Sequence, residues 1–179
     1  ERLSMPTQVD ATTGTTPLLV AGRIIGVDVS PDGQDVDRVG VLHGRGLSAA
    51  DDGAPTAVVD VHFAERHDLT LPGTARIGAG VAVTYVGAGE APEQFLSMTD
   101  SGTMFAQTSF AVFYTSLRTA QSLTGAGGQV NELAVRFAPG TALPAGVTHD
   151  FSLGVNRTWP ASSEMAMLSR KTGLQHRQE

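Results

Sequence analysis

The stretch from Phe110 to Gly140, FAVFYTSLRTAQSLTGAGGQVNELAVRFAPG, constrains the fold more than any other part of the chain. Residues 111–114 form a continuous apolar and aromatic run, which predicts a strand. Thr115 or Ser116 is the expected N-cap of a short helix, whose apolar residues follow at helical spacing. The glycine-rich run at 125–128 ends that helix, and residues 130–137 alternate as a returning strand. The stretch therefore predicts a local βαβ unit.

The rest of the chain adds further strands and one more helix to this unit. Apolar and β-branched residues predict strands at about 18–29, 56–61 and 76–86, and a short helix at 63–69. Residues 1–16 are polar, and residues 12–16 (TTGTT) are expected to form a turn or mobile loop. Strand–helix–strand units at both ends, with strands between them, indicate an α+β fold. A chain of 179 residues with 41% hydrophobic content suffices for one domain or two small subdomains.

Several motifs in this stretch and upstream of it match, in order, those of one family. The upstream matches lie in a first strand, in a Gly-Arg segment followed by aspartates, and in a strand leading into a helix: Ile25-Gly26-Val27-Asp28, Gly44-Arg45-Gly46-Leu47 with Asp51-Asp52, and Ala57-Val58-Val59 with Ala64-Glu65-Arg66, Leu69 and Gly73. The downstream matches are Phe113-Tyr114, Leu117, Ala120-Gln121, Leu123, Gly125, residues 130–135 (VNELAV) and Pro139-Gly140.

This ordered series resembles the extracytoplasmic domain of MacB/FtsX-type ABC transporter permeases, the MacB-like periplasmic core domain. The resemblance runs from about Gly22 to Gly140. It implies a porter-like α/β subdomain made of residues 1–74 and 109–160, with a β-rich insert at 75–108. Residues 161–179 would then lead toward a membrane helix, and the chain would be an excerpt from between two transmembrane helices.

The resemblance also implies a non-catalytic function. Such a domain contacts substrate or a partner protein outside the membrane and moves with the ATP-driven motion of the transmembrane helices. Its partners would be its own transmembrane helices, a separate nucleotide-binding subunit, and an extracytoplasmic protein or a peptide or lipid substrate. It would lie at the extracytoplasmic face of the bacterial plasma membrane. The alternatives are a secreted or surface binding module and, less favoured, a hydrolase with a spatially assembled site.

The composition of the chain argues against nucleic acid as a partner and excludes chemistry that needs cysteine. The formal net charge is −6 and no basic cluster occurs, so nucleic acid is not an expected partner. Cysteine is absent, which excludes disulfides, thiol catalysis and cysteine–zinc sites. No apolar run approaches the roughly 20 residues of a transmembrane helix.

One titratable cluster, residues 60–68 (DVHFAERHD), is a candidate metal site. His62 and His67 are five residues apart, whereas a helical zinc motif needs two histidines four apart on one face. We therefore interpret the cluster as a strand-to-helix junction with a solvated polar helix face that includes Glu65 and Arg66. His43 and His149 are interpreted as isolated surface or loop residues.

Other chemistry-bearing patterns are weaker still. The glycine pairs 78/80 and 87/89 and the run 125–128 lack phosphate-loop spacing and are interpreted as turns and helix ends. Asp51 and Asp52, with Asp35 and Asp37, are interpreted as a solvated acidic loop rather than a cation site. Ser97, Ser101 and Ser109 have no histidine near them in sequence, and residues 156–158 match a glycosylation sequon. Residues 98–105 are interpreted as core packing around a loop, with an exposed contact surface as the alternative. We therefore expect no catalytic, cofactor-binding or metal-binding residues.

Overall fold

The computed structural model describes residues 1–12, 17–31, 38–91, 110–132 and 159–160. Seven strands in these ranges form one sheet: β1 (Leu3–Asp10), β2 (Leu19–Val27), β3 (Gly40–Gly44), β4 (Thr56–Asp60), β5 (Gly73–Ile77), β6 (Val81–Glu90) and β7 (Phe110–Ser116). The other elements are a 3₁₀ turn at Ala49–Asp51, helices α1 (Val61–Arg66) and α2 (Leu117–Thr124), and a separate two-stranded pair of β8 (Gln129–Val130) and β9 (Trp159–Pro160).

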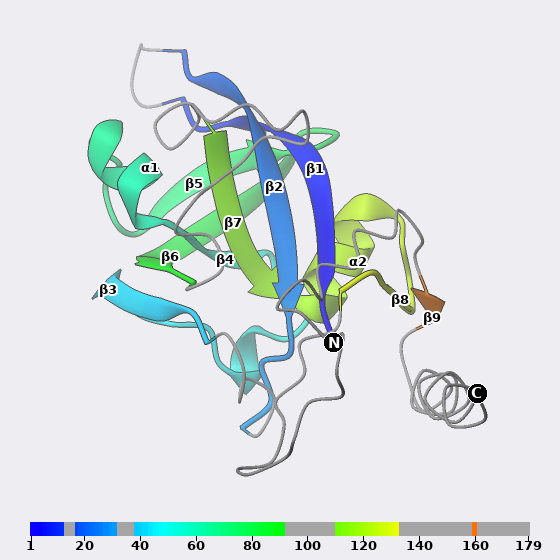
Figure 1. Ribbon diagram of the computed structural model, residues 1–179. Helices are drawn as coiled ribbons and strands as arrows, with labels where there is room; N and C mark the ends of the chain where they lie inside the picture. The colour runs from blue at the N-terminus through cyan, green and yellow to red at the C-terminus, as the bar shows by residue number, and fades with distance from the viewer. Residues whose placement is uncertain (13–16, 32–37, 92–109, 133–158, 161–179) are drawn as a thin grey trace, which may run out of the picture.

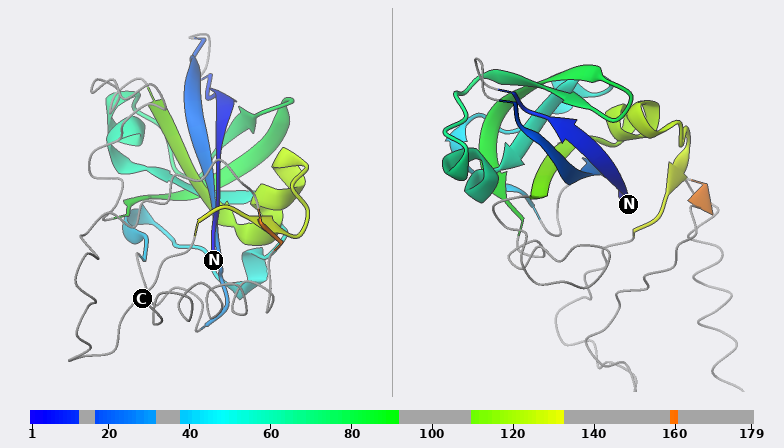
Figure 2. Two further views of the ribbon diagram at one scale, coloured as in Figure 1. Left: turned by 45° about the vertical axis from the view of Figure 1, so that its right-hand side comes forward. Right: turned by 90° about the horizontal axis from the view of Figure 1, so that it is seen from above.

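Six of the seven strands close into a barrel (Figures 1 and 2). The strand order is β6-β4-β7-β2-β1-β5, and β5 pairs with the first half of β6 to complete the circle. β3 pairs with the second half of β6 and lies outside the circle. The pairs β2–β7 and β4–β6 are parallel, and the others are antiparallel. α1 and α2 lie on opposite sides of the barrel.

The barrel overturns the expected α+β fold with porter-like βαβ subdomains. The described residues are mostly β, with 51% of them in strands, and they contain only two α-helices. The βαβ prediction was right for its first two elements, since β7 and α2 are present and Ser116 caps α2. The expected return strand does not rejoin the sheet beside β7, because Gln129 and Val130 pair antiparallel with β9 instead. Residues 133–137, which complete that predicted strand, lie outside the described residues.

Burial on both faces of β7 explains why its sequence resembles a strand of a parallel α/β sheet. Ala111 and Phe113 point into the barrel and belong to its core, with Ile24, Val59 and Tyr85 among others. Phe110, Val112 and Tyr114 point outward and form a second cluster with Ile25, Val27, Val29, Val58 and Ala91. A strand buried on both faces has a continuous apolar run whether the cover is a helix layer or a barrel core plus outer cluster. The run therefore does not distinguish the two folds.

Two strands differ from their predicted positions for clear physical reasons. β1 lies in the polar range 1–16, for which no strand was predicted. Pro6 is tolerated because β1 pairs along its whole length with β2, whereas its other edge meets β5 only at Val9 and Asp10. The single strand expected at 76–86 is a hairpin, in which residues 78–80 turn the chain from β5 into β6.

Close backbone approaches position α2 and β3. A Cβ atom on Gly26 of β2 would lie 2.5 Å from the Cβ of Ala120, so α2 rests directly on the backbone of β2. A Cβ on Gly87 of β6 would lie 2.2 Å from the carbonyl oxygen of Arg45, so the segment after β3 passes directly against β6. Glycines 87 and 89, expected to lie in a turn, are therefore strand residues.

The expected subdomain boundaries, 1–74 with 109–160 around an insert at 75–108, stay a prediction. β6 lies in the same barrel as strands from residues 1–74. No helix within the described ranges has the length and apolar character needed to cross a bilayer.

Candidate functional site

A polar loop between β3 and β4 folds over the outer face of the barrel. The guanidinium of Arg45 donates two hydrogen bonds to the carboxylate of Asp51, Nη1 to Oδ2 at 2.8 Å and Nη2 to Oδ1 at 2.9 Å. The amide and hydroxyl of Ser48 donate to the same carboxylate, both at 2.9 Å. Because of the Arg45 hydrogen bonds and the Ser48 donors, the pKa of Asp51 falls to about 2. The aspartate expected in a solvated acidic loop is thus buried and paired.

The start of α2 holds the other end of this loop. Oγ of Ser116 accepts hydrogen bonds from the amides of Gly53 at 2.9 Å and Thr119 at 3.1 Å. The hydroxyl of Thr119 donates to the carbonyl of Ala54 at 2.7 Å. Arg118 pairs with Asp52 across 3.1 Å. The loop is therefore fixed at both ends, by Arg45–Asp51 and by α2.

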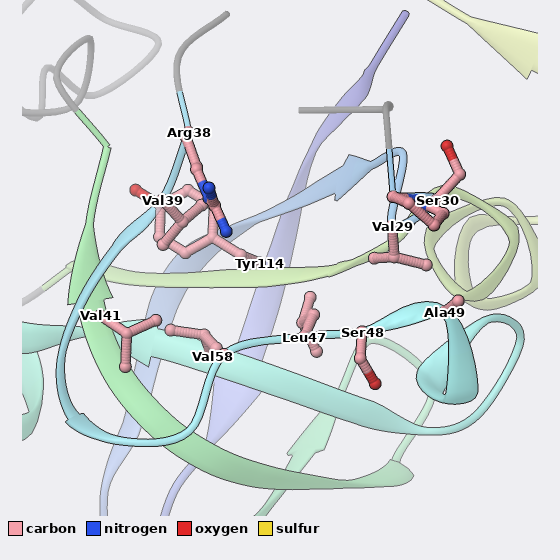
Figure 3. Close-up of a pocket in the computed structure, with 12 residues that line it drawn as sticks. Val29, Ser30, Arg38, Val39, Val41, Leu47, Ser48, Ala49, Val58 and Tyr114 are labelled. Atoms are coloured by element: carbon pink, nitrogen blue, oxygen red, sulfur yellow. The ribbon is translucent and has the colours of Figure 1, made fainter. Parts of the chain in front are cut away.

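A cavity of about 380 Å³ opens between this loop and the outer face of β4 and β7 (Figure 3). Arg38 and Val39 lie on one side of it, and Val29, Ser30 and Ala49 on the opposite side. Its walls combine aliphatic side chains with polar groups, and its full lining is Val29, Ser30, Pro31, Arg38, Val39, Val41, Gly46, Leu47, Ser48, Ala49, Val58 and Tyr114. It is the candidate binding site of the described part of the chain.

Tyr114 contributes its ring to the cavity wall and has an unusual hydroxyl. The side chain is fully buried, and its hydroxyl forms no hydrogen bond with any residue that the structure describes. Burial, with a smaller contribution from the nearby carboxylate of Asp60, raises the pKa of this hydroxyl well above its ordinary value. The amide of Ala91 faces the oxygen and opposes that shift, but it lacks hydrogen-bond geometry. Tyr114 is therefore a neutral apolar wall residue.

The titratable cluster at residues 60–68 forms the junction between β4 and α1, as predicted. Asp60 caps α1 by accepting a hydrogen bond from the amide of Phe63 at 3.0 Å. Burial raises the pKa of Asp60, and the Phe63 hydrogen bond partly offsets this. The ring of His67 packs on Phe63 with 4.6 Å between centroids.

His62 of this cluster and His43 of β3 each lie beside a glutamate side chain. His62 pairs with Glu90 of β6, at 3.4 Å between Nε2 and Oε2. Glu65 is exposed, as expected, and its Oε1 lies 3.7 Å from Nε2 of His43 on β3. His43 is exposed too, but this contact means that it is not isolated. Among the residues that the structure describes, no three histidine, aspartate or glutamate side chains converge as metal ligands.

Several sequence candidates lie outside the described residues. These are Asp35, Asp37, Ser97, Ser101, Ser109, His149, the 98–105 segment and the sequon at 156–158. Asp28 is described, and its carboxylate accepts a hydrogen bond from the amide of Ser30 at 2.9 Å.

Sequence reasoning missed the cavity and its one charged wall residue, Arg38. The segment before β3 has no clear helical or strand periodicity, so the sequence does not predict where the Arg38 side chain lies. The reasoning also gave Asn131 only a core-strand role. Its side-chain amide instead bonds the backbone of Ser4 twice, accepting from the Ser4 amide and donating to the Ser4 carbonyl, each at 2.7 Å. Asn131 therefore holds the chain after α2 against β1.

Comparison with known proteins gives one similar structure. No protein-family model matches the chain, and no curated protein matches it. Among solved structures, the chain is similar to the extracellular domain of the noncanonic ABC-type transporter YknZ from Gram-positive bacteria, at 14% identity and a TM-score of 0.46. The match covers 69% of this chain and 56% of the YknZ chain, so this chain spans little more than half of that domain.

Proposed function

We propose that this chain is the extracytoplasmic domain of an ABC transporter permease of the MacB/FtsX type and that it is non-catalytic. It contacts substrate or a partner protein outside the membrane. It moves with its own transmembrane helices, which a separate nucleotide-binding subunit drives by ATP hydrolysis. Its place is the extracytoplasmic face of the bacterial plasma membrane.

One observation carries the proposal: the motif residues that are dispersed in sequence form one connected unit in space. The matched strands β4, β7 and β2 are neighbours in the barrel. The Gly-Arg and Asp-Asp pieces of one motif meet in the Arg45–Asp51 ion pair. The Asn of the VNEL motif bonds Ser4 on β1, the strand next to β2. The motif residues therefore contact one another and stabilise the same part of the fold. This supports the view that the motifs were matched as one set.

The geometry supports a mechanical role better than a chemical one. Six strands pair in a closed circle, in which the β1–β5 contact is limited to Val9 and Asp10, and the outer loop is fixed at two ends. Such a unit can move as a rigid body when its connections to the membrane move. In the described residues, the hydroxyls of Ser116 and Thr119 bond to backbone groups and to each other, and the hydroxyl of Ser48 donates to Asp51. Arg45 also binds the Asp51 carboxylate, whose pKa is lowered to about 2, so Asp51 is a weak base for activating Ser48.

Two experiments test the proposal. The first determines the coding sequence on both sides of this chain, where we expect apolar helices of about 20 residues on each side. The second uses the absence of cysteine in the chain. In the full-length protein with its other cysteines removed, Arg66→Cys on α1 should react with a membrane-impermeant maleimide in intact cells. Reaction only after lysis, or a coding sequence without flanking apolar helices, would favour a secreted or cytoplasmic module instead.

A further inference from the structure

We propose that the cavity beside Tyr114 binds an aliphatic monocarboxylate, a molecule with an apolar chain and a single negative charge. This inference does not depend on the proposed transporter function, because it rests only on the walls, charge and frame of the cavity.

The walls of the cavity offer aliphatic contacts to the chain of a ligand. Val29, Val39, Leu47, Val58 and the ring of Tyr114 present aliphatic and aromatic surface toward one space. The volume of about 380 Å³ lies within the range of pockets that hold small molecules. Val39 and Leu47 are partly exposed, so a ligand chain that covers them removes apolar surface from water, whereas Val58 and Tyr114 are buried behind them.

The charge of the cavity selects an anion. Arg38 is the one charged residue among those that line it. No hydrogen bond or ion pair involves Arg38 in the part of the chain that the structure describes. The nearby carboxylate of Asp51 is bound by Arg45 and Ser48, so it does not neutralise Arg38. A carboxylate at the rim can therefore pair with Arg38 while its chain occupies the apolar interior.

The loop and the barrel surface that enclose the cavity are held in place without a ligand. The loop that carries Leu47, Ser48 and Ala49 is held by Arg45–Asp51 at one end and by the hydrogen bonds of Ser116 and Thr119 at the other. Binding to such a loop costs little ordering entropy. The opposite wall is the barrel surface itself, at Val58 and Tyr114.

The test compares three ten-carbon probes by isothermal titration calorimetry on the purified chain. Decanoate carries the negative charge, decan-1-ol has none, and decyltrimethylammonium carries a positive charge. We expect decanoate to bind at least fivefold more tightly than decan-1-ol and decyltrimethylammonium not to bind. Equal affinity for decanoate and decan-1-ol, or no binding of decanoate, overturns the proposal.

Two variants locate the site. Arg38→Gln should weaken decanoate binding about five- to tenfold, and Arg66→Gln, which removes an exposed arginine of α1 away from the cavity, should leave it unchanged. Ala49→Phe should fill the mouth of the cavity and abolish binding, with folding checked by circular dichroism. Decanoate binding that survives a folded Ala49→Phe, or that falls equally in Arg38→Gln and Arg66→Gln, places the ligand elsewhere and overturns the proposal.

Discussion

The side-chain amide of Asn131 forms two 2.7 Å hydrogen bonds with the backbone of Ser4, 127 residues earlier in the chain. One amide group thus replaces a backbone pair and holds the segment after α2 on β1. Next to it, the backbone amide and carbonyl of Arg2 bond Glu132 and Asn131. The start of the barrel and the segment that follows α2 are therefore tied together at this point.

Replacement of Asn131 should destabilise the fold. Asn131→Ala removes both hydrogen bonds to Ser4, each worth about 1 kcal/mol, so we expect a loss of about 2 kcal/mol in urea unfolding. Gln129→Ala changes an exposed neighbour and should cost less than about 0.5 kcal/mol. Equal unfolding midpoints for the Asn131 variant and the unmodified chain would contradict this account of the VNEL motif.

The Arg45–Asp51 pair should make stability fall in acid. The pKa of Asp51 in the folded chain is about 2, below its ordinary value of 3.8. A lowered folded pKa means that the stabilisation is complete above about pH 4 to 5 and is lost as the pH falls toward 2. Because Arg45 is half exposed, we expect about 1 to 2 kcal/mol rather than the full value of the shift.

Urea unfolding at pH 7 and pH 3 measures this effect. Asp51→Asn should lower stability at pH 7 and should lose less stability on acidification than the unmodified chain. Asp68→Asn, at an exposed aspartate after α1, serves as the control and should keep the pH dependence. If Asp51→Asn retained the full pH dependence, the stabilising role of this ion pair would be wrong.

A methyl group at Gly26 should displace α2. Its Cβ would lie 2.5 Å from the Cβ of Ala120 and 3.1 Å from the Cα of Leu117, so Gly26→Ala overpacks the contact between β2 and α2. Overpacking of this kind costs about 1 to 3 kcal/mol. Gly127→Ala is the matched control, because a Cβ there meets no atom within 4 Å. The prediction fails if the two variants unfold at the same urea concentration.

The hydroxyl of Tyr114 should be dispensable. A buried hydroxyl without a partner costs free energy, so Tyr114→Phe should keep the stability or raise it by up to about 1 kcal/mol. Most buried tyrosines lose stability on this change, because they lose a hydrogen bond. A loss of more than 1 kcal/mol in thermal or urea unfolding would mean that the hydroxyl has a partner.

Local signals in the sequence predicted individual elements well and their arrangement poorly. Ser116 before α2 and the β-branched run of β4 are local signals, and both were read correctly. Closure of the barrel depends on the pairing of β5 with β6 and β1, which no local pattern encodes. The sequence predicted one strand at 76–86, whereas the chain turns at residues 78–80 and forms the two strands β5 and β6. A single strand at this position would leave the sheet open.

The candidate site was harder to predict for a similar reason. Arg45 and Asp51 matched a motif, but only the fold shows that they pair. Arg38 and Tyr114 come from distant segments and meet at the cavity without any spacing rule that links them.

The central claim is that this chain belongs to an ABC transporter permease, and copurification of an ATPase tests it most directly. The full-length parent protein, affinity-purified from detergent-solubilised membranes of its own cells, should retain a nucleotide-binding subunit in stoichiometric amount. The preparation should hydrolyse ATP, and a substitution in the ATP-binding motif of that subunit should abolish the activity. A parent protein recovered from the soluble fraction, or from membranes without any ATP-hydrolysing subunit, would contradict the claim.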